Sequence, residues 1–226
     1  MWFICYPDTT PIEHLPFYTI SVGMHLWQYP TPRENGYPYP QFLYSNKGKG
    51  KLITEGKTWS IPEHSIVFLP ANVPHYYEAV TKDIWDVRWF VPFGDGTLAL
   101  LKEFGFDRCR IFPITNLGVL DEIHNKIHMA FQINTKESIF FSASYTYEFI
   151  FEFYRQYKKH SSPKSAQYRR RLTPLIEYIE HHFTSEITQS MLCEHVGFHN
   201  LNYFCKEFKR YTGSTPTSYR NSTRES

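Results

Sequence analysis

The sequence predicts an α+β protein with an N-terminal β-sandwich or small barrel, a helical segment and a C-terminal all-α helix-turn-helix unit. Short runs rich in β-branched and aromatic residues, separated by turn signals, fill residues 1–96. Amphipathic patterns with apolar residues three and four apart occupy residues 97–160. A polar stretch at 161–170 interrupts every periodicity and is the expected linker. Shorter helical patterns follow at 171–226.

Four strand-like runs define the first part, and glycine-rich turns such as Asn46–Gly50 and Pro92–Gly96 separate them. Because no helical pattern intervenes, they favour a sandwich or barrel over a parallel sheet. Ahead of them, residues 1–16 are predicted to form an extended arm that leads into a strand around Tyr18–Gln28. The four runs are Phe42–Ser45, Lys51–Glu55, Ser65–Leu69 and Ile84–Val91.

Three helices are predicted in the middle of the chain. A short one starts at Leu98, and the segment Leu117–Ile133 places its apolar residues on one face. The segment Ser138–Lys159 is longer and unusually aromatic. A helix with so broad an aromatic surface is expected to pack against the sheet and a neighbouring helix, including across a homodimer.

Charge is unevenly distributed along the chain, although the net charge is only +2. From Arg155 to Ser226 there are 12 Lys and Arg but 6 Asp and Glu, a local charge of +6, which leaves −4 for the rest. A basic C-terminal segment on a mildly acidic body indicates an anion-binding module, with nucleic acid as the leading candidate. A solvated basic face is the alternative.

Cysteine usage and hydropathy indicate a cytoplasmic protein. The four cysteines, at positions 5, 109, 193 and 205, contain no C-x-x-C pair, which argues against a disulfide framework or a zinc knuckle. No run approaches the roughly 20 apolar residues of a membrane span, so we expect no membrane partner. The amino end also lacks the pattern of a secretory signal.

The C-terminal part is predicted to form three helices around an apolar core. Thr188 is expected to cap the second helix, Gly197 to make a sharp turn, and Asn200 to cap a third helix that ends near Gly213. Two short helices joined by such a turn are typical of a helix-turn-helix, whose second helix enters the major groove of DNA. The apolar stripe of the first helix is Leu172, Leu175, Ile176, Ile179 and Phe183.

The periodicity of the third helix sorts its side chains by role. If Phe204 and Phe208 face the core, the polar residues of the first turns face outward, where Asn can pair with adenine and Lys with guanine. Basic residues further along suit phosphates. An ordinary helical hairpin with a charged outer face is the alternative. The candidate DNA-binding residues are Asn200, Asn202, Cys205, Lys206, Lys209, Arg210 and Arg220.

The segment Val196-Gly-Phe-His-Asn-Leu-Asn-Tyr-Phe-Cys-Lys-Glu-Phe-Lys-Arg-Tyr-Thr-Gly-Ser-Thr-Pro-Thr-Ser-Tyr-Arg closely resembles the signature of the AraC/XylS family of transcription regulators. The Gly-Phe, Tyr-Phe, Phe-Lys, Gly, Thr-Pro and Tyr-Arg elements of that signature all stand in register. The resemblance covers some 50 residues and implies a protein that binds promoter DNA.

The amino-terminal half is similar to the cupin-type sensor domain of the same family in the segments Tyr44–Leu52, Ile66–Tyr77 and Trp85–Gly94. The resemblance implies a cupin-like jelly roll that binds a small effector, often a sugar, and a helical segment that dimerises. An arginine and an indole suit a sugar, because the guanidinium donates to hydroxyls and the ring covers C–H groups. The effector positions that the resemblance implies are Arg33, Tyr77, Val87 and Trp89, with Val87 where a polar group is expected.

One departure from the family pattern concerns the DNA-binding domain. The family carries two helix-turn-helix units, whereas this sequence is expected to hold one, with Ser226 as its last residue. Two explanations stay open: the chain is cut short after the first unit, or an internal stretch has been lost. A monomer with one unit should bind an operator weakly, and dimerisation should partly restore the affinity.

Enzymatic chemistry finds little support in the sequence. A metal-binding cupin usually carries an H-x-H pair, but His75 is followed by Tyr76-Tyr77, so we expect no metal, no cofactor and no catalytic residues. We therefore predict a regulator that binds DNA in response to a small molecule. Two alternatives stay open: a cupin enzyme with a vestigial tail, and a dimerisation partner that does not bind DNA alone.

Overall fold

The computed structural model divides the chain into two compact units, residues 1–157 and 158–226. The structure describes residues 2–80, 84–161, 172, 174–176, 178–179, 188–212 and 215–224, apart from the side chains of 210, 211 and 221–224.

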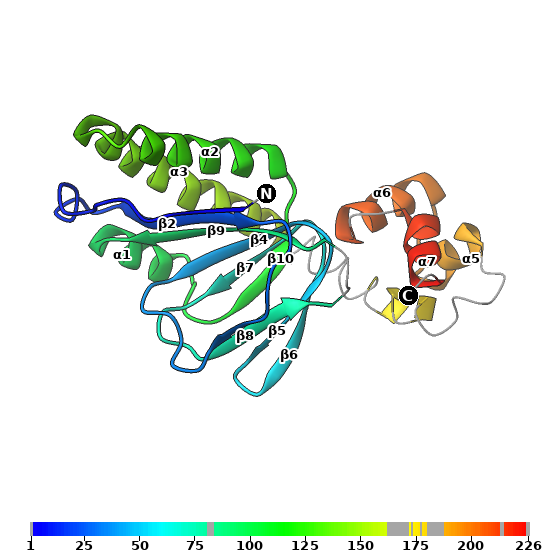
Figure 1. The fold of residues 1–226 in the computed structure, drawn as a ribbon. Helices are drawn as coiled ribbons and strands as arrows, with labels where there is room; N and C mark the ends of the chain where they lie inside the picture. Colours follow the sequence, from blue (N-terminus) through cyan, green and yellow to red (C-terminus); the bar gives the residue numbers. More distant parts are fainter. Residues whose placement is uncertain are drawn as a thin grey trace. The chain divides into compact units, whose positions relative to one another are not determined.

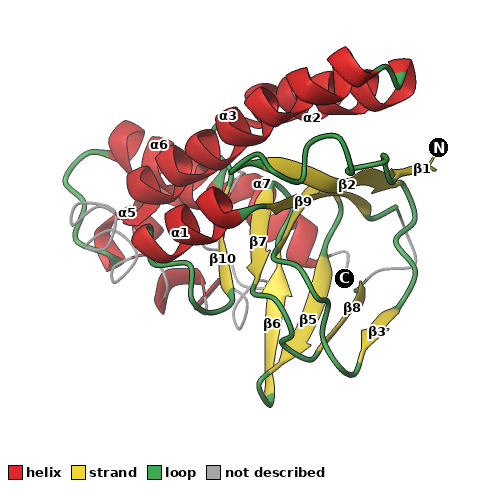
Figure 2. Ribbon diagram, turned by 90° about the vertical axis from the view of Figure 1, so that its left-hand side faces the viewer, coloured by secondary structure: helices red, strands yellow, loops and turns green. Residues whose placement is uncertain are grey.

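Two antiparallel sheets form the first unit (Figures 1 and 2). The larger has the strand order β1-β2-β9-β4-β7-β10 and the smaller the order β3-β8-β5-β6. Both sheets contribute residues to one apolar cluster, so they pack as a sandwich. The strands are β1 (Trp2–Cys5), β2 (Tyr18–His25), β3 (Thr31–Arg33), β4 (Gln41–Lys47), β5 (Gly50–Thr54), β6 (Lys57–Ile61), β7 (Ser65–Leu69), β8 (His75–Ala79), β9 (Asp86–Phe93) and β10 (Arg110–Pro113).

Three helices of the first unit, α1 between β9 and β10 and α2 and α3 after β10, lie close to their predicted places. α2 (Leu117–Ile133) is confirmed at both ends, α1 (Asp95–Glu103) begins three residues before the predicted start, and α3 (Lys136–Ser161) is longer than predicted. Asn116 caps α2 by accepting a hydrogen bond from the Val119 N–H.

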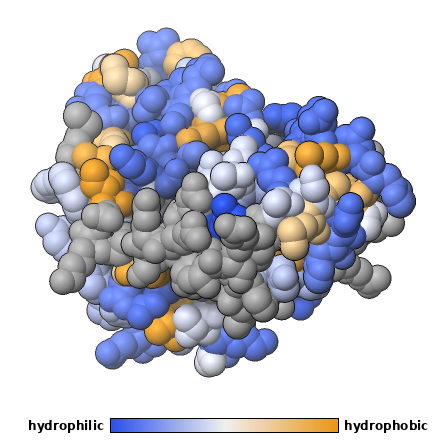
Figure 3. Space-filling model, turned by 90° about the vertical axis from the view of Figure 1, so that its right-hand side faces the viewer, coloured by the Kyte–Doolittle hydropathy of each residue, from blue (hydrophilic) through white to orange (hydrophobic). Residues whose placement is uncertain are grey.

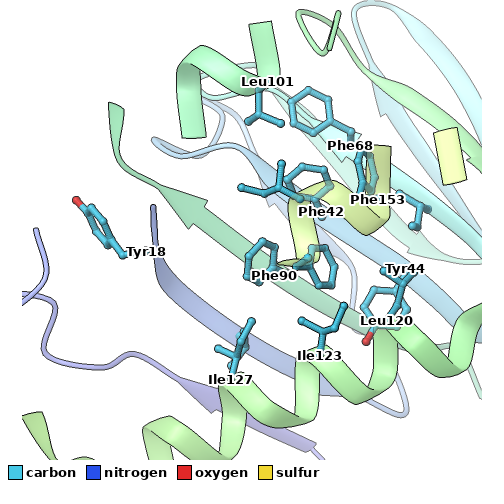
Figure 4. Packing of buried hydrophobic residues seen from close by; sticks show 14 of the residues in the cluster. Tyr18, Phe42, Tyr44, Phe68, Phe90, Leu101, Leu120, Ile123, Ile127 and Phe153 are labelled. Atoms are coloured by element: carbon cyan, nitrogen blue, oxygen red, sulfur yellow. The ribbon is translucent and has the colours of Figure 1, made fainter. Parts of the chain in front are cut away.

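Helices α2 and α3 lie along one face of the six-stranded sheet (Figures 1 and 4), where an aromatic core joins them to it. The Phe42 ring lies 4.2 Å from that of Phe153, and the Phe90 ring 4.1 Å from that of Phe149. These four side chains are fully buried. The aromatic helix therefore packs against the sheet, as predicted, while Phe141 and Tyr147 on the same helix stay exposed.

A polar cluster lies between the sheet and α2. The Arg88 guanidinium pairs with the Asp121 carboxylate, and the Tyr44 hydroxyl donates to the same carboxylate at 3.1 Å. His124 on α2 lies within 3.2 Å of the Gly23 and Trp89 carbonyl oxygens, and burial lowers its pKa to about 4. These contacts connect α2 to β4 and β9. The hydrophobic periodicity of the sequence does not predict them.

The amino-terminal segment is docked onto this unit. Its first residues form β1, which pairs with β2 in the register Trp2 to His25. Ile12 is fully buried in the aromatic core, and the Thr97 N–H donates to the Pro16 carbonyl at 3.1 Å. The prediction of an extended arm is therefore confirmed for β1 and wrong for residues 10–14, which form turns.

The second unit contains α5 (Gln189–His195), α6 (Leu201–Thr212) and α7 (Pro216–Arg224), with the described residues between 172 and 179 also helical. Their core includes Leu172, Leu175 and Ile179 from the predicted apolar stripe, whose Phe183 lies outside the described residues. No helix among the residues described is long and apolar enough to cross a membrane.

Candidate DNA-binding helix and effector site

Helices α5 and α6 form the predicted helix-turn-helix. The Thr188 side chain accepts a hydrogen bond from the Met191 N–H at 3.2 Å, and Gly197 turns the chain with φ of +64°. The Asn200 Oδ1 accepts from the Tyr203 N–H at 2.9 Å, so both predicted caps are confirmed. Gly213, the expected stop, lies outside the described residues.

Helix α6 has a buried face with two phenylalanines and an exposed face with polar side chains. Phe204 and Phe208 are fully buried, whereas Asn202, Lys206 and Lys209 are exposed. Because these three polar residues are four and three positions apart, they lie on one face of the helix. That face offers an amide and two ammonium groups, the side chains that reach base edges and phosphates.

Cys205 differs from its polar neighbours on α6. Its half-buried thiol donates to the Gln189 Oε1 at 3.6 Å, and the Gln189 Nε2 donates in turn to the Thr217 hydroxyl at 2.6 Å. Burial raises the pKa of the Cys205 thiol, which favours the neutral form. Cys205 thus links α6 to α5, and through Gln189 to α7.

The remaining candidates on this unit occupy different positions. Asn200 is exposed at the start of α6, where its side chain serves as the cap. Arg220 is half-buried on α7. Arg210 is helical, but its side chain lies outside the described part of the chain. In Figure 3, hydrophilic residues predominate among the described residues on the visible face, and hydrophobic ones are scattered among them.

All four candidate effector residues belong to the interior side of the sandwich. Tyr77 and Val87 are buried in the cluster between the sheets, and Trp89 packs against it. Arg33 on β3 pairs directly with His75 on β8. His75 lies two residues before Tyr77, so Arg33, His75 and Tyr77 are on the same face of this sheet. The structure therefore brings together four residues that are separated by up to 56 positions in the sequence.

Three further polar residues share this interior and were missed by the sequence analysis: His25, Gln41 and His75. Each has a buried nitrogen or oxygen that forms no hydrogen bond with the residues the structure describes. His25 packs edge-on against the Trp89 ring at 5.4 Å. The alternation of Gln41 and Phe42 in the sequence indicates that the two side chains lie on opposite faces of β4. Which of the two faces the interior between the sheets depends on the strand register, which the sequence does not give.

A glycine on β2 makes room for Trp89. A Cβ on Gly23 would lie 2.0 Å from the Trp89 Cζ2 and 2.6 Å from the Phe3 carbonyl oxygen. Gly23→Ala is therefore expected to lower the free energy of unfolding by about 1–3 kcal/mol, because backbone and a packed indole must both move. Urea denaturation of the two proteins measures the difference.

Gly118 provides the matched control. In the first turn of α2, a Cβ on Gly118 meets only the Asn116 Oδ1, at 3.8 Å. Gly118→Ala is expected to raise the free energy of unfolding by about 0.5 kcal/mol. Equal effects of the two substitutions would contradict the packing of Trp89 on Gly23.

Two family profiles match the chain. One, described as bacterial regulatory helix-turn-helix proteins of the AraC family, covers residues 179–221. The other, described as the AraC-like ligand binding domain, covers residues 16–138. The chain belongs to the AraC family of transcription regulators. Members of this family are DNA-binding regulators, not enzymes, so the predicted family, α+β fold and non-enzymatic character are confirmed.

Solved structures of ToxT from Vibrio cholerae are similar to the chain. ToxT of strain O395 bound to (E)-4-(8-methylnaphthalen-1-yl)but-3-enoic acid is 18% identical, with 92% of this chain and 99% of that chain covered and a TM-score of 0.39. Apo ToxT K231A of strain SCE256 is 16% identical, with coverages of 92% and 98% and a TM-score of 0.39. No curated protein matches the sequence.

Proposed function

We propose that this AraC-family regulator reads promoter DNA with the exposed face of α6 and responds to a small polar molecule held between the two sheets. One observation carries the first half: Asn202, Lys206 and Lys209 share the exposed face of a helix whose opposite face is buried through Phe204 and Phe208. In a helix-turn-helix, this is the face that meets the major groove.

The residues of α6 have distinct proposed roles. Asn202 lies in the first turn, where it pairs bidentately with an adenine, and Lys206 follows one turn later to donate to a guanine. Lys209, Arg210 and the α7 residue Arg220 contact phosphates. Asn200 supports these contacts by capping the start of α6, and Cys205 supports them by holding α6 against α5.

Two substitutions separate base reading from phosphate binding. Asn202→Ala is expected to weaken specific binding by about 1–3 kcal/mol and to relax base preference at one position. Lys209→Ala is expected to weaken binding to all sequences alike and to lower the salt slope by about one. Fluorescence anisotropy on promoter fragments and random DNA measures both, with and without candidate sugars.

The matched control is Lys102→Ala, which removes an exposed lysine from α1 in the other unit. It is expected to leave affinity and salt slope unchanged. If Asn202→Ala and Lys209→Ala behave alike on promoter and random DNA, the roles assigned along α6 are wrong. Flat titrations with every DNA would instead favour a dimerisation partner that does not bind DNA alone.

The effector half of the proposal rests on the interior residues. Trp89 offers an indole face, Arg33 a donor group and Tyr77 a hydroxyl, which together suit a sugar, while Val87 supplies apolar contact. Effector binding controls DNA affinity only if the two states of the protein bind the effector differently. Identical DNA isotherms with every candidate sugar would contradict this control.

We also propose a homodimer through the turn between α2 and α3. Met129, Ile133 and Phe141 are each more than half exposed there. A surface pocket of about 540 Å³ is lined by Lys136, Glu137, Phe140 and Phe141. In a two-fold interface between identical chains, such a surface can pair its apolar residues with their copies and Lys136 with the partner's Glu137.

Phe141→Ser is expected to shift the protein toward monomer, because it removes a large apolar side chain from this surface and adds a hydroxyl. Sedimentation velocity measures the oligomeric state. Tyr29→Ser, which changes an aromatic residue that is 70% exposed elsewhere on the unit, serves as control. A monomeric wild type, or a dimer that Phe141→Ser leaves unchanged, would contradict this interface.

A further inference from the structure

Three polar side chains are gathered at one end of the sandwich interior. Arg33 ends β3, Gln41 begins β4 and His75 begins β8. The connecting segments 34–40 and 70–74 meet at this end, because the Asn72 N–H donates to the Tyr37 carbonyl at 2.7 Å. The three residues, named here the end cluster, therefore come from three strands to one place.

Register places the end cluster on the inward faces of its strands. Gln41 is two residues from Leu43, which is buried between the sheets, and His75 is two residues from Tyr77, which is buried in the same cluster. Arg33 is the direct antiparallel partner of His75, so both share one face. All three side chains therefore belong to the interior shared with Trp89 and Val87.

Each member of the end cluster has a buried polar atom without a hydrogen-bond partner among the described residues. These atoms are the Arg33 Nε, the Gln41 Oε1 and the His75 Nε2. Gln41 and His75 are each only 5% exposed. Buried polar groups in native proteins are almost always paired, and leaving one unpaired is costly. Three such atoms on one interior leave hydrogen-bonding capacity that a polar ligand can fill.

The histidine presents an acceptor to this interior. Its Nδ1 lies 2.8 Å from the Val73 carbonyl oxygen, and since a carbonyl only accepts, the Nδ1 carries the proton. Burial, together with the charge of Arg33, lowers the pKa of His75 and keeps the ring neutral. The His75 Nε2 and the Gln41 Oε1 are therefore both acceptors, and a ligand must offer hydrogen-bond donors to them.

The half-buried Arg33 brings a positive charge to the end cluster. No carboxylate of the described residues lies within ion-pair distance of Arg33, whose neighbour is the Tyr37 ring at 5.2 Å from its guanidinium carbon. A guanidinium matches a carboxylate in charge and in its two-pronged geometry. A neutral sugar would offer the Arg33 guanidinium no carboxylate partner.

We infer that the effector is a polyhydroxylated carboxylate of the sugar-acid class, held by Arg33 through its carboxylate and by Gln41 and His75 through its hydroxyls. The inference rests on the proposed effector site and narrows its ligand from sugars in general to acidic ones. Trp89 then covers the C–H face of the same molecule.

Isothermal titration calorimetry of the full chain tests the inference. The probes are glucuronate, galacturonate, gluconate and galactonate, beside the neutral counterparts glucose, galactose and glucitol and the unhydroxylated carboxylate butyrate. At least one sugar acid is expected to bind, and its neutral counterpart and butyrate are expected to bind at least tenfold more weakly.

Variants locate the binding site. Arg33→Gln is expected to weaken the sugar acid about tenfold to a hundredfold, the loss that follows removal of a charged hydrogen bond. Arg33→Lys keeps the charge and is expected to fall between Arg33→Gln and the wild type. Arg108→Gln, which alters an arginine that is 64% exposed, serves as the matched control. Gln41→Met, of similar size, removes one acceptor without touching the charge.

Two results would overturn the inference, and they differ in what they leave standing. Equal binding of a sugar acid and its neutral counterpart would overturn the acidic class but keep a sugar effector in the sandwich. Absence of binding by all four acids would overturn the inference outright, while DNA binding by α6 would stand or fall on its own titration.

Discussion

Replacing Phe208 with alanine is expected to lower the free energy of unfolding of the second unit by about 3–5 kcal/mol and to abolish DNA binding. Phe208 is fully buried, and its ring lies 5.8 Å from those of both Phe204 and Tyr219. The core of this unit is small, so the loss is a large share of its total stability. Far-UV circular dichroism during urea denaturation, with anisotropy on promoter DNA, measures both effects.

Lys209→Ala separates the fold of the unit from its contact with DNA. Lys209 is one residue away on the exposed face of α6, so its removal is expected to change stability by less than about 0.5 kcal/mol while still weakening DNA binding. Should Phe208→Ala unfold at the same urea concentration as the wild type, the core assigned to this unit would be incorrect.

Asp121→Ala is expected to lower the free energy of unfolding of the first unit by about 3 kcal/mol. It removes the carboxylate that pairs with the Arg88 guanidinium, whose side chain is only 16% exposed, and it leaves that charge without its nearest partner. The Tyr44 hydroxyl loses its acceptor in the same step. Thermal unfolding of the full chain, followed by near-UV circular dichroism, measures the change.

Glu122→Ala is the matched control for Asp121→Ala. The Glu122 carboxylate pairs with Lys126 one turn away at 2.9 Å, but both side chains are exposed. A solvent-exposed ion pair contributes little, so the loss is expected to stay below about 0.5 kcal/mol. A loss as large for Glu122→Ala as for Asp121→Ala would contradict the role of the cluster beneath α2.

The helical elements were largely predictable from the sequence, because their signals are local. Thr188 and Asn200 stand immediately before apolar periodic runs, and both serve as caps. The spacing of Phe204 and Phe208 alone indicates which face of α6 is buried. The exposed positions of Asn202 and Lys206 follow from the same geometry.

The sequence did not lead to a prediction of β1, β3, β6, β8 or β10, and the first three of these carry weak local signals. β1 and β3 have four and three residues, and β6 is exposed along most of its length, so alternation of polar and apolar residues has little room to show. The docking of the amino-terminal segment depends on Ile12, a single apolar residue whose burial is fixed by the fold.

The effector site, too, was predictable from the sequence only in part. Arg33 and Trp89 were found through family resemblance. Gln41 was not singled out, and His75 was considered only as a metal ligand and not as an effector residue. Their inward orientation depends on pairing between strands that are far apart in the sequence, and their unpaired atoms become evident only when the surrounding residues are in place.

Selection of bound sequences from a random DNA pool tests the central claim, that α6 reads bases through its exposed face. The wild type is expected to enrich one motif, and Asn202→Ala is expected to enrich the same motif with preference lost at one position. An identical motif from Asn202→Ala and the wild type, or no motif from the wild type, would contradict base reading by this helix.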